Sequence, residues 1–281
     1  MGSRRPRYRH AVTLSDAAAA AAAAHLARLD SLAPGQVSAV HVIGSSVLDD
    51  YHPHTSDIDL VIELARDPSE ADLRALLDAH TGVGAKVEGT YVASGKWADP
   101  ASAASLISDG VVHFASKKLH AVTRLQLASY AATIRGAAPP IEADVPAAQE
   151  FCRRNLVSYW QEWLTGGPRI MLRHAPAPLT PRWKWTVVWV GLGPARLWWT
   201  INTGEIVSKS RAGQLAAEHW PDLGEQLLDI VAERAGKDVK LNNKHGRAAV
   251  ELGRRIMAEV DQTEEQSPAE DDDTNAAGAP D

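Results

Sequence analysis

Two polar motifs near the amino end have the residue types needed to bind a nucleoside triphosphate and a metal ion. The first is Gly44-Ser45, which follows a short apolar run rich in β-branched residues at 37–43. Glycine permits a sharp turn and a close backbone approach to a ligand. The N–H groups after Ser45 could open a short helix whose amino end suits a phosphate. The sequence therefore predicts a strand that ends at Gly44 and a phosphate-binding turn directly behind it.

The second motif is an Asp-x-Asp pair, Asp57 and Asp59, at the start of an apolar run that continues to Ile62. Residues two apart in a strand project from the same face. Two carboxylates on one face make a seat for Mg²⁺, a hard cation that prefers oxygen ligands and can bridge the protein to a triphosphate. An isolated Asp-x-Asp is most often a solvated loop pair. The strand and Gly-Ser before it, and the strand after it, favour the metal site.

A third carboxylate belongs to Glu88, in a further predicted strand at 86–92. If this strand lies beside the Asp-x-Asp strand, Glu88 can point to the same face as the two aspartates. It would then lie where an acceptor hydroxyl must lose its proton. The alternative is a surface glutamate on an edge strand.

These motifs resemble the signatures of the polymerase-β-type nucleotidyltransferases, in particular the streptomycin/spectinomycin-type aminoglycoside adenylyltransferases. A further segment downstream is similar to that family's carboxyl-terminal helix and its Thr-Gly-x-Ile-x-x-Lys turn. The resemblance covers about residues 37–257. The matching segments are 44–45, 56–60, 87–90, 196–198 and 203–209.

The resemblance implies a role for each matching residue. Asp57 and Asp59 would bind Mg²⁺, and Glu88 would be the general base. The residues implied to contact the nucleotide are Gly44, Ser45, Ser56, Arg196 and Lys209. The implied reaction is the Mg²⁺-dependent transfer of AMP from ATP to a hydroxyl of a small molecule. In the family that molecule is an aminoglycoside, and the activity gives antibiotic resistance.

The acceptor stays open, because one segment departs from the family. Residues 183–188 start a predicted helical stretch and contain no acidic side chain to attract a cationic aminoglycoside. Most of the tryptophans also fall in this half of the chain and are expected in the core, since aromatic residues at helical spacing usually pack. Trp163 is a candidate for lining the cleft and stacking on adenine or on an acceptor ring.

The predicted fold class is an α/β (α+β) nucleotidyltransferase domain with a small mixed sheet, followed by an all-α helical bundle. Within the first domain, the small and polar segment 94–110 is expected to be a loop with a short helix. Within the second, Gly191, Gly193 and Pro194 are expected to interrupt a helix. The expected domains are a flexible basic arm at 1–15, the nucleotidyltransferase domain at 16–138, the helical domain at 139–261, and a disordered acidic tail at 262–281.

Composition narrows the classes of partner. The formal net charge of −6 comes largely from the acidic tail, so the body is near neutral and gives no reason to expect a nucleic-acid partner. Cys152 is the single cysteine, which excludes a disulfide framework and a multi-cysteine zinc site and suits a reducing, cytoplasmic compartment. No apolar run is long enough to span a membrane, and the basic amino end lacks the apolar core of a secretory signal.

The leading hypothesis is thus an enzyme whose partners are ATP and a small hydroxylated acceptor. One rival is a nucleotidyltransferase that modifies a protein or tRNA, as some minimal enzymes of toxin–antitoxin systems do. The large helical second half favours the small-molecule enzyme, which uses such a half to close its cleft. Another rival is a non-catalytic nucleotide-binding regulator, which would be expected to lack a catalytic carboxylate, whereas this sequence has all three.

Overall fold

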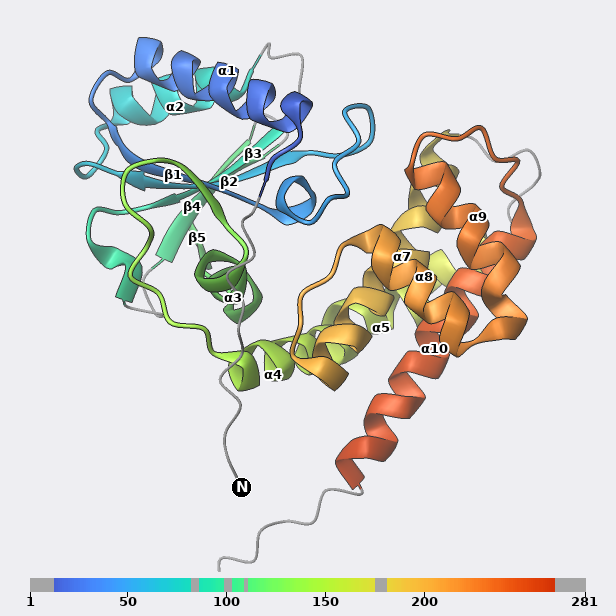
Figure 1. Cartoon of the computed structure of the whole chain (residues 1–281). Helices are drawn as coiled ribbons and strands as arrows, with labels where there is room; N and C mark the ends of the chain where they lie inside the picture. The colour runs from blue at the N-terminus through green and yellow to red at the C-terminus, as the bar shows by residue number, and fades with distance from the viewer. Residues whose placement is uncertain (1–12, 82–85, 99–102, 109–110, 175–180, 266–281) are drawn as a thin grey trace, which may run out of the picture.

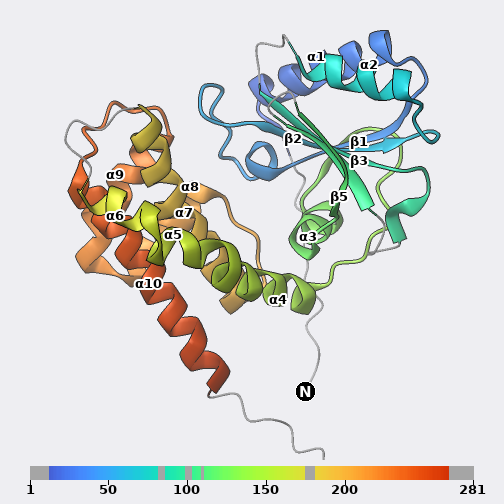
Figure 2. The ribbon, with the colours of Figure 1, turned by 180° about the vertical axis from the view of Figure 1, so that it is seen from behind.

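The structure is a computed structural model that describes residues 13–81, 86–98, 103–108, 111–174 and 181–265. Two parts lie side by side, one built on a sheet and the other from helices (Figures 1 and 2). The predicted arm and acidic tail lie mostly outside the described residues. The predicted division at residue 138 falls between the last strand and the first helix of the helical part, and it stays a prediction.

The sheet has six strands in the order β5-β4-β3-β2-β1-β6. β2 and β3 are parallel, and the other neighbouring pairs are antiparallel, so the sheet is mixed as predicted. The bounds are β1 Val37–Ile43, β2 Ile58–Leu64, β3 Val87–Val92, β4 Ala103–Ser108, β5 Val111–Lys118 and β6 Ala132–Arg135. The strands predicted from apolar, β-branched runs are β1, β2 and β3.

Helices cover both faces of the sheet (Figure 1). On one face lie α1 (Asp16–Leu32) and α2 (Glu70–His80), whose buried alanines and leucines pack on β1 and β2. Ser15 caps α1 by accepting a hydrogen bond from the N–H of Ala18, as expected for a serine before a helix. On the other face lies α3 (Ala121–Ser129), which contributes Leu127 to a second apolar cluster. Both faces of the central strands are therefore buried.

The prediction of a loop with a short helix at 94–110 was largely wrong. A single 3₁₀ turn, η2, forms at Lys96–Ala98, and β4 and β5 then form a hairpin on the edge of β3. The residues at 103–105 are Ala, Ala and Ser, which are not strong strand formers. Pairing with β3 overrides their weak local preference, and single-sequence patterns do not reveal such pairing.

The helical part is confirmed as predominantly α-helical. Its long central helix α7 packs against α4, α8, α9 and α10. The apolar cluster between these helices is the core of the helical part. The elements are α4 Val145–Asn155, the π-helical turn η3 Leu156–Trp160, α5 Gln161–Thr165, α6 Gly167–His174, α7 Pro181–Thr203, α8 Lys209–His219, the 3₁₀ turn η4 Pro221–Leu223, α9 Gly224–Arg234 and α10 Asn243–Glu265.

The expected interruption of a helix at Gly191, Gly193 and Pro194 was wrong, because α7 runs through all three. The glycines serve packing. A Cβ on Gly193 would collide with the indole ring of Trp160, and one on Gly191 would lie 3.1 Å from Cδ1 of Ile230. Pro194 removes one helical hydrogen bond. The helix persists because its neighbours bury it on several sides.

Replacing Gly193 with alanine is expected to lower the free energy of unfolding by about 1–3 kcal/mol, the usual cost of overpacking a core. The physical reason is the collision of the new Cβ with Trp160. Urea unfolding should show the loss. Gly167→Ala is the matched control, because a Cβ there meets nothing within 4 Å. Equal stability of the two variants would contradict the packing role of Gly193.

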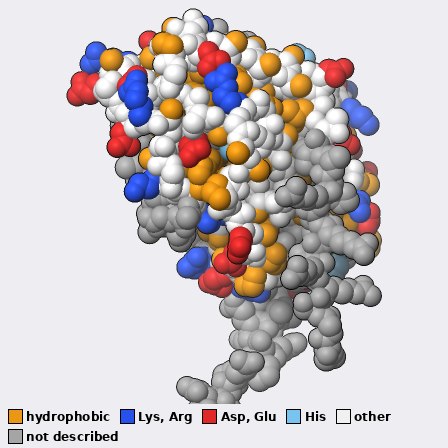
Figure 3. All heavy atoms as spheres, turned by 60° about the vertical axis from the view of Figure 1, so that its left-hand side comes forward, with side chains coloured by type: hydrophobic (Ala, Val, Ile, Leu, Met, Phe, Trp, Pro, Cys, Tyr) orange, Lys and Arg blue, Asp and Glu red, His pale blue; other side chains and the backbone are white. Residues whose placement is uncertain are grey.

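Among the residues that the structure describes, no helix is both long and apolar enough to cross a lipid bilayer. Charged side chains of both signs are interspersed with apolar ones on the face drawn in Figure 3. That face therefore does not present the one-sided basic surface that nucleic-acid binding uses.

Candidate active site

Three carboxylates meet at one end of the parallel strand pair. In the register of β2 and β3, Asp59 lies directly opposite Glu88. Asp57 comes immediately before β2. All three side chains line a cavity of about 360 Å³. The condition placed on Glu88, that its strand lie beside the Asp-x-Asp strand, is therefore met.

Gly44 joins the first motif to these carboxylates. Its backbone has φ of +72°, a conformation that favours glycine, and a Cβ at this position would collide with the carboxylate of Asp59. The N–H of Gly44 donates a hydrogen bond of 3.0 Å to Oε1 of Gln126 on α3. The chain then forms the short 3₁₀ helix η1 (Gly44–Val47), which places Ser45 in the cavity lining. The turn predicted after the first strand is thus present.

Burial and the two neighbouring carboxylates both disfavour the ionised form of Asp59. Burial, together with the negative charges of Glu88 and Asp57, raises the pKa of Asp59 to about 7. Lys209 and Arg196 act in the opposite direction. A site with this much negative charge is suited to a cation, whose binding would favour the ionised form of Asp59.

The helical part supplies a cationic wall opposite the carboxylates. Arg196 comes from α7, Lys209 is the first residue of α8, and Arg234 is the last residue of α9. Burial, together with the charges of Arg196 and Arg234, lowers the pKa of Lys209 to about 8. Three neighbouring cations repel one another, and an anionic ligand between the two walls would relieve this repulsion.

The structure brings eight of the nine sequence-predicted residues into this one cavity. They are Gly44, Ser45, Ser56, Asp57, Asp59, Glu88, Arg196 and Lys209. Trp163 instead packs against the apolar core of the helical part and is not among the described residues that line the cavity.

Comparison with known proteins places the carboxylate motifs within a matched domain. Residues 24–94, which span β1, the Asp-x-Asp strand and β3, match the family model described as a nucleotidyltransferase domain. By this match, the part of the chain that carries the three carboxylates resembles a nucleotidyltransferase domain. The motifs had predicted this family from the same strands, and the prediction is confirmed.

The fold is similar to a solved structure described as spectinomycin adenyltransferase AAD(9) from Enterococcus faecialis with ATP and spectinomycin. The TM-score is 0.61 at 14% sequence identity, and the match covers 85% of this chain and 98% of that chain. The likeness therefore extends over both parts of the chain and shows that the two proteins share a fold. No curated protein matches by sequence.

Sequence reasoning missed several residues that line the cavity. Gln126 and Arg234 had no motif to mark them, because each reaches the cavity through tertiary packing. Trp189 was one tryptophan among many, yet it lines the cavity, and Nζ of Lys209 lies 4.8 Å from the centre of its ring. Its ring stacks on Trp185, with centroids 5.5 Å apart and an interplanar angle of 9°. Trp185 is 58% exposed, so the pair forms an accessible aromatic surface.

The carboxylates of the cavity fit a Mg²⁺ ion that is also coordinated by the phosphates of a bound nucleotide. In the described residues, no group of three or more His, Cys, Asp or Glu side chains is arranged to hold a metal ion alone. Mg²⁺ is usually held by one or two carboxylates together with water and substrate phosphates. Asp57 and Asp59 can supply these carboxylates. The excess negative charge around Asp59 supports the same assignment.

Proposed function

We propose that this enzyme transfers AMP from ATP to a hydroxyl group of a small molecule in a Mg²⁺-dependent reaction. The observation that carries the proposal is one cavity with two unlike walls. The strand pair supplies Asp57, Asp59 and Glu88, and the helical part supplies Arg196 and Lys209. The fold neighbour's description, with ATP and an aminoglycoside, supports the same class of substrates.

The proposed roles divide between binding and proton transfer. Asp57 and Asp59 would hold Mg²⁺, which when bound neutralises charge on the triphosphate. Arg196 and Lys209 would bind the phosphates from the opposite side. Ser45 and Ser56 would offer hydroxyl groups to the phosphate oxygens, and Gly44 lets the backbone turn close to them.

Glu88 would act on the acceptor. Its carboxylate takes the proton of the acceptor hydroxyl as that oxygen forms a bond to the α-phosphorus of ATP. The bond from the α-phosphorus to the bridging oxygen of the β-phosphate breaks in line, and pyrophosphate leaves. The products are the AMP ester of the acceptor and pyrophosphate, and the proton stays on Glu88 until solvent removes it.

The acceptor is proposed as a small hydroxylated molecule, with aminoglycosides as one class to test. The described residues that the helical part adds to the cavity are cationic, aromatic or hydroxylated, and none of them is acidic. A polycationic acceptor would therefore have to rely on carboxylates that already serve the metal and the base. Trp189 replaces Trp163 as the residue proposed to stack on a ring of the substrate.

A pyrophosphate-release screen tests the function. Each nucleoside triphosphate is supplied with Mg²⁺ and a panel of aminoglycosides and other hydroxylated small molecules. We expect release with ATP and at least one acceptor, and none from Asp57→Asn. Labelling of protein or tRNA by the enzyme, with no release in the small-molecule panel, would overturn the proposed acceptor class in favour of a macromolecule.

Lys209→Ala is expected to weaken Mg-ATP binding by about 10- to 100-fold, since a hydrogen bond to a charged group contributes roughly 1.5–3 kcal/mol. Calorimetry on the full-length protein measures the affinity. Lys244→Ala is the control, because Lys244 is exposed on α10 and does not line the cavity. If both variants bind Mg-ATP as the unaltered protein does, Lys209 has no phosphate-binding role.

A further inference from the structure

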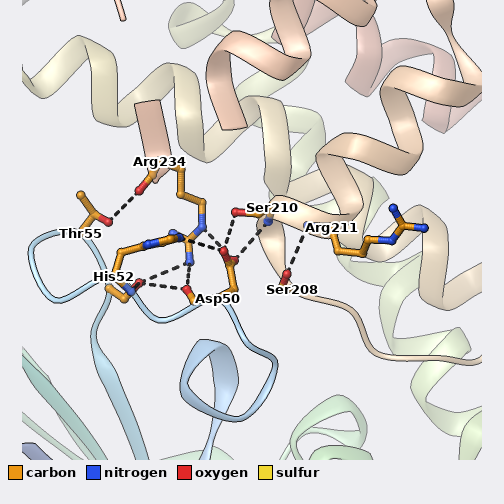
Figure 4. Close-up of polar contacts among 8 residues, drawn as sticks. Asp50, His52, Thr55, Ser208, Ser210, Arg211 and Arg234 are labelled. Carbon is orange, nitrogen blue, oxygen red and sulfur yellow. Dashed lines mark hydrogen bonds and ion pairs between the residues drawn. The ribbon is translucent and has the colours of Figure 1, made fainter. Parts of the chain in front are cut away.

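A buried carboxylate joins the two parts of the enzyme next to the cavity. Asp50 lies in the loop between η1 and β2 and is only 3% exposed. Two helices of the other part reach it, α9 through Arg234 and α8 through Ser210 (Figure 4). Arg234 is itself only 6% exposed. The contact is thus a buried ion pair between segments far apart in the sequence.

Asp50 uses both carboxylate oxygens in this contact. Oδ2 accepts hydrogen bonds from Nε of Arg234 at 3.1 Å and from the N–H of Ser210 at 3.2 Å. Oδ1 accepts a hydrogen bond from Oγ of Ser210 at 2.5 Å. Asp50 therefore fixes the first turn of α8, in which Lys209 immediately precedes Ser210.

The same loop is tied to Arg234 a second time. Thr55 Oγ1 donates to the carbonyl oxygen of Arg234 at 2.9 Å, and Nη2 of Arg234 donates to the carbonyl oxygen of Asp50 at 3.3 Å. Ser56 follows in the chain, and its Oγ accepts the N–H of His52 at 3.1 Å. The loop that carries Ser56 and the end of α9 are thereby held as one unit.

Burial alone would raise the pKa of Asp50. The Arg234 guanidinium and the hydroxyl and N–H of Ser210 outweigh it and hold the pKa below its ordinary range. Asp50 is therefore ionised at neutral pH. It is not among the described residues that line the cavity, whereas Ser56, Lys209 and Arg234 are.

We propose that Asp50 is a positioning residue that holds Ser56, Lys209 and Arg234 in the geometry that binds the triphosphate. This inference rests on the proposed function. Asp50 also holds the two walls of the cavity at a fixed separation, because it belongs to the sheet-based part while Ser210 and Arg234 belong to the helical part. Neutralising it would leave Arg234 buried without its partner, a strongly unfavourable state that the protein relieves by moving α8 and α9.

Whether neutralising Asp50 weakens or tightens ATP binding distinguishes a positioning role from a direct electrostatic effect of its charge. A negative charge near the cavity repels a triphosphate, so neutralising it would tighten or not change ATP binding if charge alone mattered. If Asp50 positions the phosphate-binding groups, the same change weakens binding. Asp50→Asn tests this directly because asparagine keeps the size of the side chain.

Calorimetric titration of the full-length protein with Mg-ATP is the decisive measurement. We expect Asp50→Asn to raise Kd by about tenfold or more, equivalent to roughly 1.4 kcal/mol. Asp49→Asn is the matched control, since Asp49 is the exposed neighbour and loses the same charge. It should bind as the unaltered protein does. A purely structural role would lower the melting temperature of Asp50→Asn and leave Kd unchanged for the folded protein. That result, or tighter binding, would overturn the inference.

Ser210→Ala covers the case in which Asp50→Asn fails to fold, because it removes one hydrogen bond and keeps the ion pair with Arg234. A folded Ser210→Ala with weaker Mg-ATP binding supports the positioning role, and unchanged affinity overturns it.

The proposed function has its own control. If the unaltered protein binds no Mg-ATP, the proposed function fails and this inference with it. If the unaltered protein binds Mg-ATP and Asp57→Asn does not, the proposed nucleotide site stands, and the Asp50 variants then test the role of Asp50 alone.

Discussion

Glu88→Gln is expected to lower kcat for AMP transfer by about 10²- to 10⁴-fold, the usual contribution of a general base. Glutamine keeps the shape of the side chain and cannot take a proton. Glu88 lies opposite Asp59 in the parallel strand pair and lines the cavity, so the acceptor hydroxyl can be placed beside it. The measurement is steady-state pyrophosphate release with the acceptor found in the screen.

The same variant should retain most of its affinity for Mg-ATP, because the phosphate-binding groups proposed are on other residues. Calorimetry checks this point. Glu142→Gln serves as the control, since Glu142 is exposed and is not a lining residue of the cavity. Near-normal turnover of Glu88→Gln with a genuine acceptor would show that Glu88 is not the base. A loss of Mg-ATP binding equal to the loss of turnover would instead assign it to the metal.

Local patterns were enough to predict the carboxylate wall of the site. β1, β2 and β3 are apolar and β-branched, each is flanked by turn residues, and Asp57, Asp59 and Glu88 fall at strand ends where one parallel pairing brings them together. The pairing itself was an assumption, which the register of β2 and β3 has confirmed. In these segments the strand propensity and the placement of the carboxylates indicate the same structure, so the sequence alone was sufficient to predict it.

The helical wall was predicted only where a motif existed. Arg196 and Lys209 lie in segments that resemble the family, whereas Arg234 is 184 residues from its partner Asp50 and nothing near either residue in the sequence marks the pair. Trp163 and Trp189 look alike in sequence. Only packing decides that one lies against the core and the other in the cavity. Contacts between distant segments carry no local signal.

The predicted interruption of α7 at its glycines and proline was wrong for a related reason. Their intrinsic cost in a helix is real, but it is a weak prior that burial can override. Gly193 lies where the Trp160 ring leaves no room for a Cβ, so the residue that weakens the helix in isolation allows the helix to pack. The edge hairpin of β4 and β5 was missed for the same reason, since pairing with β3 decides its structure.

Asp57→Asn is expected to abolish Mg²⁺-dependent ATP binding and transfer together, which distinguishes it from Glu88→Gln. An asparagine cannot supply the negative charge that holds a hard cation, and Mg²⁺ dehydrates reluctantly, so one lost carboxylate of two is a large fraction of its protein ligands. Without the cation, the triphosphate would face the remaining charges of Asp59 and Glu88 directly. Calorimetry with and without Mg²⁺, in parallel with pyrophosphate release, measures both effects.

Asp67→Asn is the control for that change, since Asp67 is exposed shortly after β2 and does not line the cavity. It should leave both binding and transfer unchanged. The comparison with Glu88→Gln then separates the carboxylates by role: one variant loses Mg-ATP, and the other keeps Mg-ATP and loses chemistry. If Asp57→Asn still binds ATP more tightly with Mg²⁺ than without it, the cation is held elsewhere and the Asp-x-Asp pair is not its seat.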